Sequence, residues 1–310
     1  MPADRISFQI AAAAIFVSAL VAGVTACGTG SAAHLHSPQP TASATPAAQL
    51  HSGSLVVDGL TRTYHLFVPS TLEPGWPAAL VVILHPCPHT GAEVANGSHL
   101  DDFATAHRFV IVYPDGAVMA ATGGNCWNAG ICCTSADDVS FIGQMIDRLT
   151  AQLQLDKARV FVAGFSFGAA MAYRVGCELA GKVTAIASVS GALVFNSCHP
   201  VRPVSVLMMQ GTKDTNFPYQ GGGDYSIPPV ASVARLWAGL DGCGGAGVQS
   251  QAGIVTTTEW RSCRAGAMVR LELIAGATHA WFGLEPDPIP GEPDATTQVW
   301  DFFNGSSLGG

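Results

Sequence analysis

The sequence is poor in charged residues and has no excess of basic ones. Lys, Arg, Asp and Glu make up 12% of the 310 residues, which is about half the usual share in globular proteins. The formal net charge is −8 at pH 7. Binding to nucleic acid, or stable adhesion to an anionic membrane surface, depends on clustered Lys and Arg side chains. The composition therefore argues against both.

The cysteines lack the pattern of a metal site. None of the nine cysteines forms the C-x-x-C pair that is common in zinc sites, so we expect no bound metal. Apart from Cys27, the cysteines are even in number, which in an exported chain indicates up to four disulfides. The expected pairs are Cys177–Cys198 and Cys243–Cys263. Three pairings remain open for the other four, which are Cys87, Cys126, Cys132 and Cys133.

The N-terminus carries the features of an export signal. Residues 6–24 are a mostly apolar run preceded by Arg5, as in the central region of a secretory signal; a permanent transmembrane anchor is the alternative. The run ends in Val-Thr-Ala-Cys at Cys27, which resembles the lipobox of bacterial lipoproteins, whose cysteine is lipidated. We expect residues 1–26 to be a signal peptide and Cys27 to anchor the protein to the outer face of the bacterial cell membrane. Ordinary cleavage after Ala26 would instead give a free extracellular protein.

The segment after the signal lacks any apolar periodicity. Residues 27–52 are rich in Gly, Ser, Ala, Thr and Pro. Such a segment cannot bury a core, so we expect a flexible tether. Residues 53–310 contain no internal repeat and no second domain boundary, and we expect them to form one monomeric domain.

From residue 63 onward, predicted strands and helices alternate. Continuous apolar runs such as residues 79–84 are typical of buried parallel strands. The expected strands are 63–68, 79–84, 109–112, 159–163, 184–189, 204–209, 255–260 and 268–274, and the expected helices are 100–107, 137–155, 230–240, 294–303 and one that begins after residue 168. Asp137 and Asp138 are interpreted as N-terminal caps of their helix. This alternation predicts one mainly parallel sheet with helices on both faces.

The most informative motif is Gly164-Phe165-Ser166-Phe167-Gly168. It is a G-x-S-x-G pentapeptide between a predicted strand and a predicted helix. This context is typical of a nucleophile elbow, in which a sharp turn exposes the serine hydroxyl. A fortuitous Gly-Ser turn is the alternative.

A serine nucleophile needs a base, and the base needs an orienting acid. In hydrolases with this elbow, the acid and then the histidine follow the serine along the chain. Asp214 and His279 each lie in the loop after a predicted strand, at the sheet edge that carries chemistry in open α/β sheets. We expect Asp214 to be the acid and His279 the base. Asp224 and Asp241 are rival acids, but neither ends an apolar strand.

The oxyanion of the reaction needs two backbone N–H donors. One is expected from Phe167, directly after the nucleophile. The other is expected from residues 85–89. Proline has no N–H, so the two prolines in this loop leave Cys87 or His89, of which Cys87 is favoured.

Four stretches together resemble the extracellular α/β-hydrolase esterases that include polyhydroxybutyrate depolymerases, feruloyl esterases and acetylxylan esterases. The stretches are residues 84–87, residues 125–139 with Asn-Cys-Trp and Cys-Cys, the elbow, and the segments around Asp214 and His279. The resemblance implies a single-domain α/β-hydrolase fold with Ser166 as nucleophile, Asp214 as acid and His279 as base.

The chain departs from this family pattern at two points. Pro86 stands between His85 and Cys87 where the family usually has glycine, which predicts a reshaped or weakened oxyanion hole. The residues after His279 also differ from the usual Trp-Pro-Gly and include Trp281. We expect His85 and Trp281 to line the substrate pocket, although Trp281 is equally compatible with a packed loop.

These observations predict a secreted serine carboxylesterase that works through an acyl-enzyme and needs no cofactor. Its expected substrates are feruloyl, acetyl or short hydroxyacyl esters of small molecules, saccharides or polyesters. An envelope acyltransferase or a peptidase on the same fold is the alternative function, and a non-catalytic binding lipoprotein is a further one.

Overall fold

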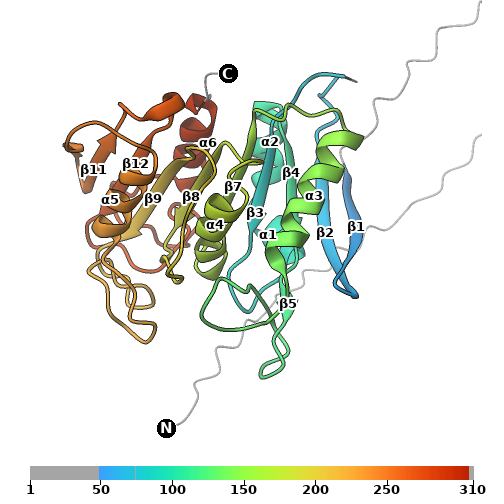
Figure 1. Ribbon diagram of the computed structural model, residues 1–310, viewed down its shortest axis with the longest axis horizontal. Coiled ribbons are helices and arrows are strands. Elements are labelled where there is room, and N and C mark those ends of the chain that lie inside the picture. The colour runs from blue at the N-terminus through green and yellow to red at the C-terminus, as the bar shows by residue number, and fades with distance from the viewer. Residues whose placement is uncertain (1–48, 74, 307–310) are drawn as a thin grey trace, which may run out of the picture. The chain divides into compact units, whose positions relative to one another are not determined.

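The computed structural model describes residues 49–73 and 75–306, and within them ten strands form one sheet (Figure 1). The strand order is β1-β2-β4-β3-β7-β8-β9-β12-β11-β10. The strands are β1 Gln49–Val57, β2 Leu60–Val68, β3 Leu80–Leu84, β4 Val110–Pro114, β7 Val160–Phe165, β8 Ala185–Val189, β9 Ser205–Gly211, β10 Val248–Ala252, β11 Val255–Trp260 and β12 Val269–Ile274. Two further short strands, β5 Ala117–Val118 and β6 Asn125–Cys126, pair only with each other.

The centre of the sheet is parallel and its two edges are antiparallel. Strands β4, β3, β7, β8, β9 and β12 pair in parallel, while β1 and β2 on one side and β11 and β10 on the other join antiparallel. The central strands are buried throughout, for example in β3 and β8, as expected where helices cover both faces of parallel strands. The prediction of one mainly parallel sheet is confirmed.

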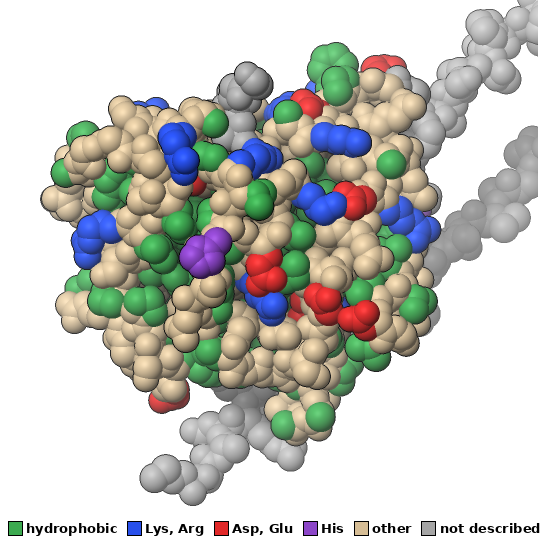
Figure 2. Space-filling view, viewed as in Figure 1, with side chains coloured by type: hydrophobic (Ala, Val, Ile, Leu, Met, Phe, Trp, Pro, Cys, Tyr) green, Lys and Arg blue, Asp and Glu red, His purple; other side chains and the backbone are tan. Residues whose placement is uncertain are grey.

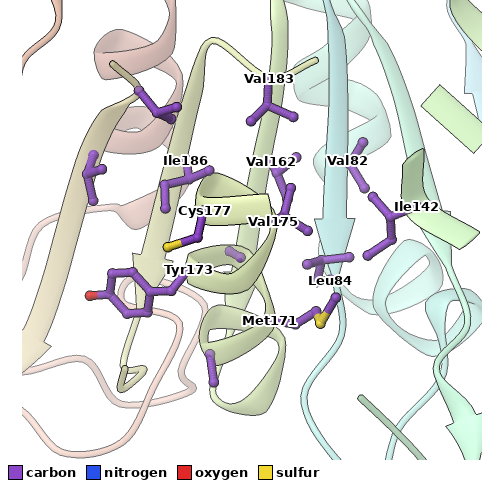
Figure 3. Packing of buried hydrophobic residues seen from close by; sticks show 14 of the residues in the cluster. Val82, Leu84, Ile142, Val162, Met171, Tyr173, Val175, Cys177, Val183 and Ile186 are labelled. Atoms are coloured by element: carbon purple, nitrogen blue, oxygen red, sulfur yellow. The ribbon is translucent and has the colours of Figure 1, made fainter. Parts of the chain in front are cut away.

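Helices cover both faces of this sheet (Figure 1). They are α1 Gly91–Gly97, α2 Leu100–His107, α3 Asp138–Gln152, α4 Phe167–Glu178, α5 Val230–Leu240 and α6 Ala295–Gly305. Buried residues of α3, α4 and α5 belong to one apolar cluster, and those of α1, α2 and α6 to a second. Side chains of β3 alternate between the clusters, since Val82 packs into the first and Val81 into the second. Figure 3 shows the first cluster, where Met171 and Val175 of α4 lie over β3 and β7.

The strand β1 begins inside the range expected for the tether. Gln49 pairs with Val68 of β2, and the antiparallel register continues to Val57 and Leu60. Residues 49–52 therefore belong to the sheet, and the expected boundary after residue 52 is too late. The expected signal peptide, the lipidated Cys27 and the rest of the tether lie outside the described residues. Within the described ranges, no helix combines the length and the apolar character needed to cross a membrane.

The structure contains both expected disulfides, Cys177–Cys198 and Cys243–Cys263. The four cysteines whose pairing was open join as Cys87–Cys126 and Cys132–Cys133. Charged side chains are scattered among apolar and uncharged ones on the face drawn in Figure 2, in line with their low share of the sequence.

Candidate active site

Ser166 occupies a sharp turn between strand β7 and helix α4. Its backbone has φ 58° and ψ −123°, a conformation that is costly for a residue with a side chain. A Cβ added to Gly164 would lie 2.2 Å from the carbonyl oxygen of Gly168, and one added to Gly168 would lie 2.1 Å from that of Leu84. Only glycine fits at both positions, because backbone atoms approach too closely for any side chain. The turn has the geometry expected of a nucleophile elbow.

The structure brings Ser166, His279 and Asp214 together in one hydrogen-bonded chain. His279 Nδ1 lies 2.9 Å from Asp214 Oδ2, and His279 Nε2 lies 2.9 Å from Ser166 Oγ. An ionised carboxylate only accepts hydrogen bonds, so Nδ1 donates to it. Nε2 of the neutral ring then accepts from the serine hydroxyl. The order of these contacts is that of a nucleophile, a base and an orienting acid.

Strand β9 and the turn that follows it fix the carboxylate of Asp214. Its Oδ1 accepts hydrogen bonds from the amides of Asn216 (2.9 Å) and Phe217 (2.8 Å). Its Oδ2 accepts from Gln210 Nε2 at 2.8 Å, and Gln210 also donates to the Phe217 carbonyl. With His279 included, four donors hold this buried group in one orientation. Gln210, four residues before Asp214, is a supporting residue that the sequence patterns did not single out.

Aromatic rings surround the imidazole of His279. The ring of Phe165 lies 5.0 Å from it and the ring of Phe217 lies 5.8 Å from it, between centroids. Phe167 and the half-exposed Tyr225 pack edge-on against each other beside Phe217. These rings leave the histidine only 16% exposed. A low exposure strengthens its polar contacts to the serine and the carboxylate.

The two backbone amides expected as oxyanion donors are those of Phe167 and Cys87. Phe167 is the first residue of α4, so its amide has no acceptor within the helix. Within the described ranges, neither this amide nor that of Cys87 makes a hydrogen bond, whereas the amide of His89 donates to the Pro86 carbonyl at 3.0 Å. A Cβ on Gly168 would also lie 2.6 Å from the His85 carbonyl, which places the start of loop 85–89 against the start of α4.

An apolar cavity of about 220 Å³ lies beside these residues. Trp281, one of the two residues expected in the pocket, is part of its wall. The other lining residues are Ile83, Leu84, Pro86, His89, Glu93, Val94, Gly97, Ser98, Leu100, Phe165 and Leu284. Phe165 and Trp281 are the chain neighbours, by one and two positions, of Ser166 and His279, although Ser166 and His279 do not themselves line the cavity. It is suited to hold an apolar group attached to the reacting carbon.

His85, the second residue expected in the pocket, does not line this cavity. Its side chain is fully buried, and both ring nitrogens have partners. The amide of Gly116 donates to Nε2 at 2.8 Å, and Nδ1 donates to the Pro86 carbonyl at 2.9 Å. Burial lowers the pKa of His85 to about 4, so the ring is neutral at pH 7. Its contacts are structural, and Pro86 and His89 form the nearby cavity wall instead.

The two aspartates interpreted as helix caps have different environments. Asp137 is the N-cap of α3 and accepts a hydrogen bond from the amide of Ser140 at 2.9 Å, which confirms the interpretation. Asp138 is not a cap. It is fully buried and forms an ion pair with Arg62 of β2.

Across residues 49–73 and 75–306, no three His, Cys, Asp or Glu side chains cluster as a metal site would require.

Comparison with known proteins gives a family match over half of the chain. The model of the family described as Esterase PHB depolymerase matches residues 62–218. The chain is 30% identical over 252 residues to feruloyl esterase B of Piromyces equi, covering 77% of this chain but only 44% of that protein. It is 25% identical to feruloyl esterase D of Neurospora crassa, covering 80% of this chain and 83% of that protein. An acetyl xylan esterase structure from Aspergillus awamori superposes with a TM-score of 0.62 at 16% identity, covering 82% of this chain and 99% of that one. That likeness establishes the α/β-hydrolase fold.

Proposed function

This chain belongs to the esterase PHB depolymerase family, and we propose that it is a serine carboxylic-ester hydrolase with Ser166 as nucleophile, His279 as base and Asp214 as acid. The observation that carries the proposal is the unbroken chain of two 2.9 Å contacts from Asp214 through His279 to the Ser166 hydroxyl. The backbone of Ser166 supports it, since such strained conformations cluster at active sites.

The proposed reaction has two halves. In the first, Ser166 Oγ attacks the ester carbonyl while its proton moves to His279 Nε2. The Phe167 and Cys87 amides donate to the oxygen that becomes negatively charged. The C–O bond then breaks, and His279 gives its proton to the departing alcohol. In the second half, water attacks the acyl-enzyme with His279 again as base, which releases the acid and restores the serine. Asp214 stays ionised and keeps the imidazole oriented throughout.

The proposed acyl groups are feruloyl, acetyl or short hydroxyacyl groups, on a small-molecule, saccharide or polyester alcohol. The names of the relatives support feruloyl and acetyl esters. The cavity supports a compact apolar acyl group, because the rings of Phe165 and Trp281 and the side chains of Ile83 and Leu100 line it. The wall also contains His89 and Glu93, whose polar atoms would favour an acyl group with a polar substituent.

We also propose that the enzyme is exported and lipid-anchored through Cys27, and that it acts as a monomer. Four disulfides among the described residues support export, because disulfides persist in oxidising compartments. Labelling of growing cells with a radioactive fatty acid tests the anchor, with the Cys27→Ser variant as control.

Hydrolysis of p-nitrophenyl acetate and methyl ferulate by the Ser166→Ala variant tests the activity. We expect hydrolysis to fall to the background rate, while circular dichroism and the melting temperature stay those of the wild type. The matched control is Ser205→Ala. Ser205 is buried, like Ser166, and its hydroxyl accepts a hydrogen bond from the Met268 amide. It is the first residue of β9 and lies at the end of that strand opposite to Asp214. Full activity in Ser166→Ala would refute the proposal.

A further inference from the structure

A separate small hairpin contacts the loop that carries the Cys87 amide and holds it in place. Strands β5 and β6 form this hairpin, in which Ala117 pairs with Cys126. Gly116, just before β5, donates its amide proton to His85 Nε2 at 2.8 Å. Trp127, just after β6, donates from Nε1 to the His85 carbonyl at 2.9 Å. The two ends of the hairpin therefore hold the side chain and the backbone of the same residue.

The hairpin holds the next part of the loop as well. A disulfide joins Cys126 of β6 to Cys87 itself. The amide of Asn125 donates to the Pro88 carbonyl at 3.2 Å, and a Cβ on Gly124 would lie 2.4 Å from the Pro88 side chain. Residues on both sides of the Cys87 amide, and Cys87 itself, are thus fixed to one hairpin.

The contacts between His85 and Trp127 are shielded from water. His85, Cys126 and Trp127 are all fully buried, and the rings of His85 and Trp127 lie 4.7 Å apart between centroids. A buried backbone group that loses its hydrogen-bond partner costs free energy. Conformations of the loop in which these hydrogen bonds are broken are therefore unfavourable. The neutral state of the His85 ring at pH 7 agrees with its role as an acceptor for the Gly116 amide.

The base of the hairpin is in turn tied to the sheet. Arg62 of β2 donates to the carbonyl of Asp115 at 2.9 Å and pairs with Asp138 at 2.5 Å. The other oxygen of Asp138 accepts from the amide of Asn128 at 2.6 Å. Asp115 and Asn128 directly flank residues 116–127. The buried ion pair of Arg62 and Asp138 therefore anchors both ends of the hairpin segment 116–127, which holds loop 85–89 in place.

We infer that Trp127 and the Cys87–Cys126 disulfide are positioning residues that hold the Cys87 amide in place as the second oxyanion donor. The inference rests on the proposed function. Pro86 restricts its own φ but contributes no donor, so it does not by itself fix the Cys87 amide. An oxyanion donor acts only if it is oriented before the reaction, because reorganisation during the reaction would remove the benefit. The hairpin supplies that orientation from outside the loop.

The inference is tested by Trp127→Phe, which removes the indole N–H and keeps an aromatic ring. The matched control is Trp237→Phe. Trp237 is equally buried, but its Nε1 has no hydrogen-bond partner in the described part of the chain. The readouts are kcat and KM for p-nitrophenyl acetate, and the inhibition constant of a trifluoromethyl ketone, whose adduct with Ser166 carries an oxyanion.

For Trp127→Phe we expect kcat to fall roughly 10- to 100-fold, with KM changed by less than about 3-fold. The inhibition constant should rise by the same factor as kcat falls. Trp237→Phe should keep kcat and the inhibition constant while losing thermal stability. A merely structural Trp127 would lower stability alone, and equal kinetics in the two variants would overturn the inference.

A second pair of variants covers the case in which Trp127→Phe does not fold. The double variant Cys87→Ser with Cys126→Ser removes the disulfide of the loop, and Cys243→Ser with Cys263→Ser removes one elsewhere. We expect only the first to lower kcat and weaken the ketone. Equal effects of the two would contradict the inference. Failure of the proposed function is distinguished from these results, because it would appear as retained activity in Ser166→Ala.

Discussion

The guanidinium of Arg62 and the carboxylate of Asp138 form an ion pair at 2.5 Å in which the two side chains are only 5% and 0% exposed. The pair joins strand β2 to the start of helix α3 across 76 residues of sequence. Burial raises the pKa of Asp138, and the nearby Arg62 opposes that rise. Removal of one partner would leave a buried charge without compensation, which is far more costly than the loss of an exposed pair.

Asp138→Asn should therefore lower the free energy of unfolding by about 3 kcal/mol. The matched control is Asp147→Asn in α3, since Asp147 pairs with Lys182 at the same 2.5 Å but is 61% exposed. Exposed pairs contribute less than about 1 kcal/mol. Urea denaturation of both variants measures the difference, and equal losses would show that burial does not set the strength of the Arg62 pair.

Asp241 should make stability depend on pH. Its Oδ1 accepts from the amide of Val204 at 3.0 Å, while Oδ2 has no partner among the described residues. Burial raises the pKa of Asp241 to about 7. Between pH 4 and 7 the carboxyl of Asp241 is protonated in the folded protein and ionised in the unfolded chain. The free energy of unfolding therefore falls as the pH rises, by up to about 1.4 kcal/mol per pH unit.

In Asp241→Asn this pH dependence is absent. We expect the unfolding free energy of the variant, relative to wild type, to be higher at pH 8 than at pH 5. Urea denaturation at the two pH values provides the measurement. A difference between the two proteins that stays constant with pH would rule out titration of Asp241 in this range.

Gly168→Ala should disrupt the elbow. The added Cβ would lie 2.1 Å from the Leu84 carbonyl oxygen, and such overpacking typically costs about 1–3 kcal/mol and shifts the backbone. We expect a lower melting temperature together with a large loss of kcat. Gly239→Ala in helix α5 is the control, because nothing lies within 4 Å of a Cβ there and alanine favours a helix by up to about 1 kcal/mol. The account is contradicted if both variants behave alike.

Asp214→Asn should abolish the correct orientation of His279. An asparagine amide would donate toward Nδ1 and so place the ring proton on Nε2, where it blocks acceptance of the serine proton. A loss of about 10⁴-fold in kcat is expected, with little change in KM. Asp224→Asn provides the control, since Asp224 is exposed on the loop before α5. Comparable losses in the two variants would remove Asp214 from the proposed mechanism.

The sequence predicted the parts of the structure whose signals are local. The elbow is a pentapeptide between a buried strand and a helix, and Asp214 and His279 each follow an apolar strand. The helix α5 was predicted at its observed bounds because its buried side recurs every three or four residues. Strand β10 was missed because all five of its residues are exposed, so no apolar alternation marks it. Helix α1 was also missed, because its seven residues are too few to show a helical period. Thr90 and Glu93 nevertheless form a capping box at its start.

The contacts around loop 85–89 had no local signal. His85 was expected in the pocket from its position before Cys87, but its partner Gly116 lies 31 residues away and Trp127 lies 42 residues away. The same holds for Arg62 and Asp138. Such pairs depend on which strands become neighbours, which single-residue patterns do not specify. The pairing of Cys87 with Cys126 was open for the same reason, and it left the adjacent Cys132 and Cys133 open as well. The two predicted pairs join cysteines that are 21 and 20 residues apart.

The most direct test of the central claim is to label the wild-type protein with a fluorophosphonate and locate the adduct by peptide mass spectrometry. We expect one adduct on the peptide that contains Ser166, and no labelling of Ser166→Ala or of wild-type protein that is denatured with acid before the probe is added. An unlabelled Ser166 in folded, ester-hydrolysing protein, or an adduct on another residue, would contradict it.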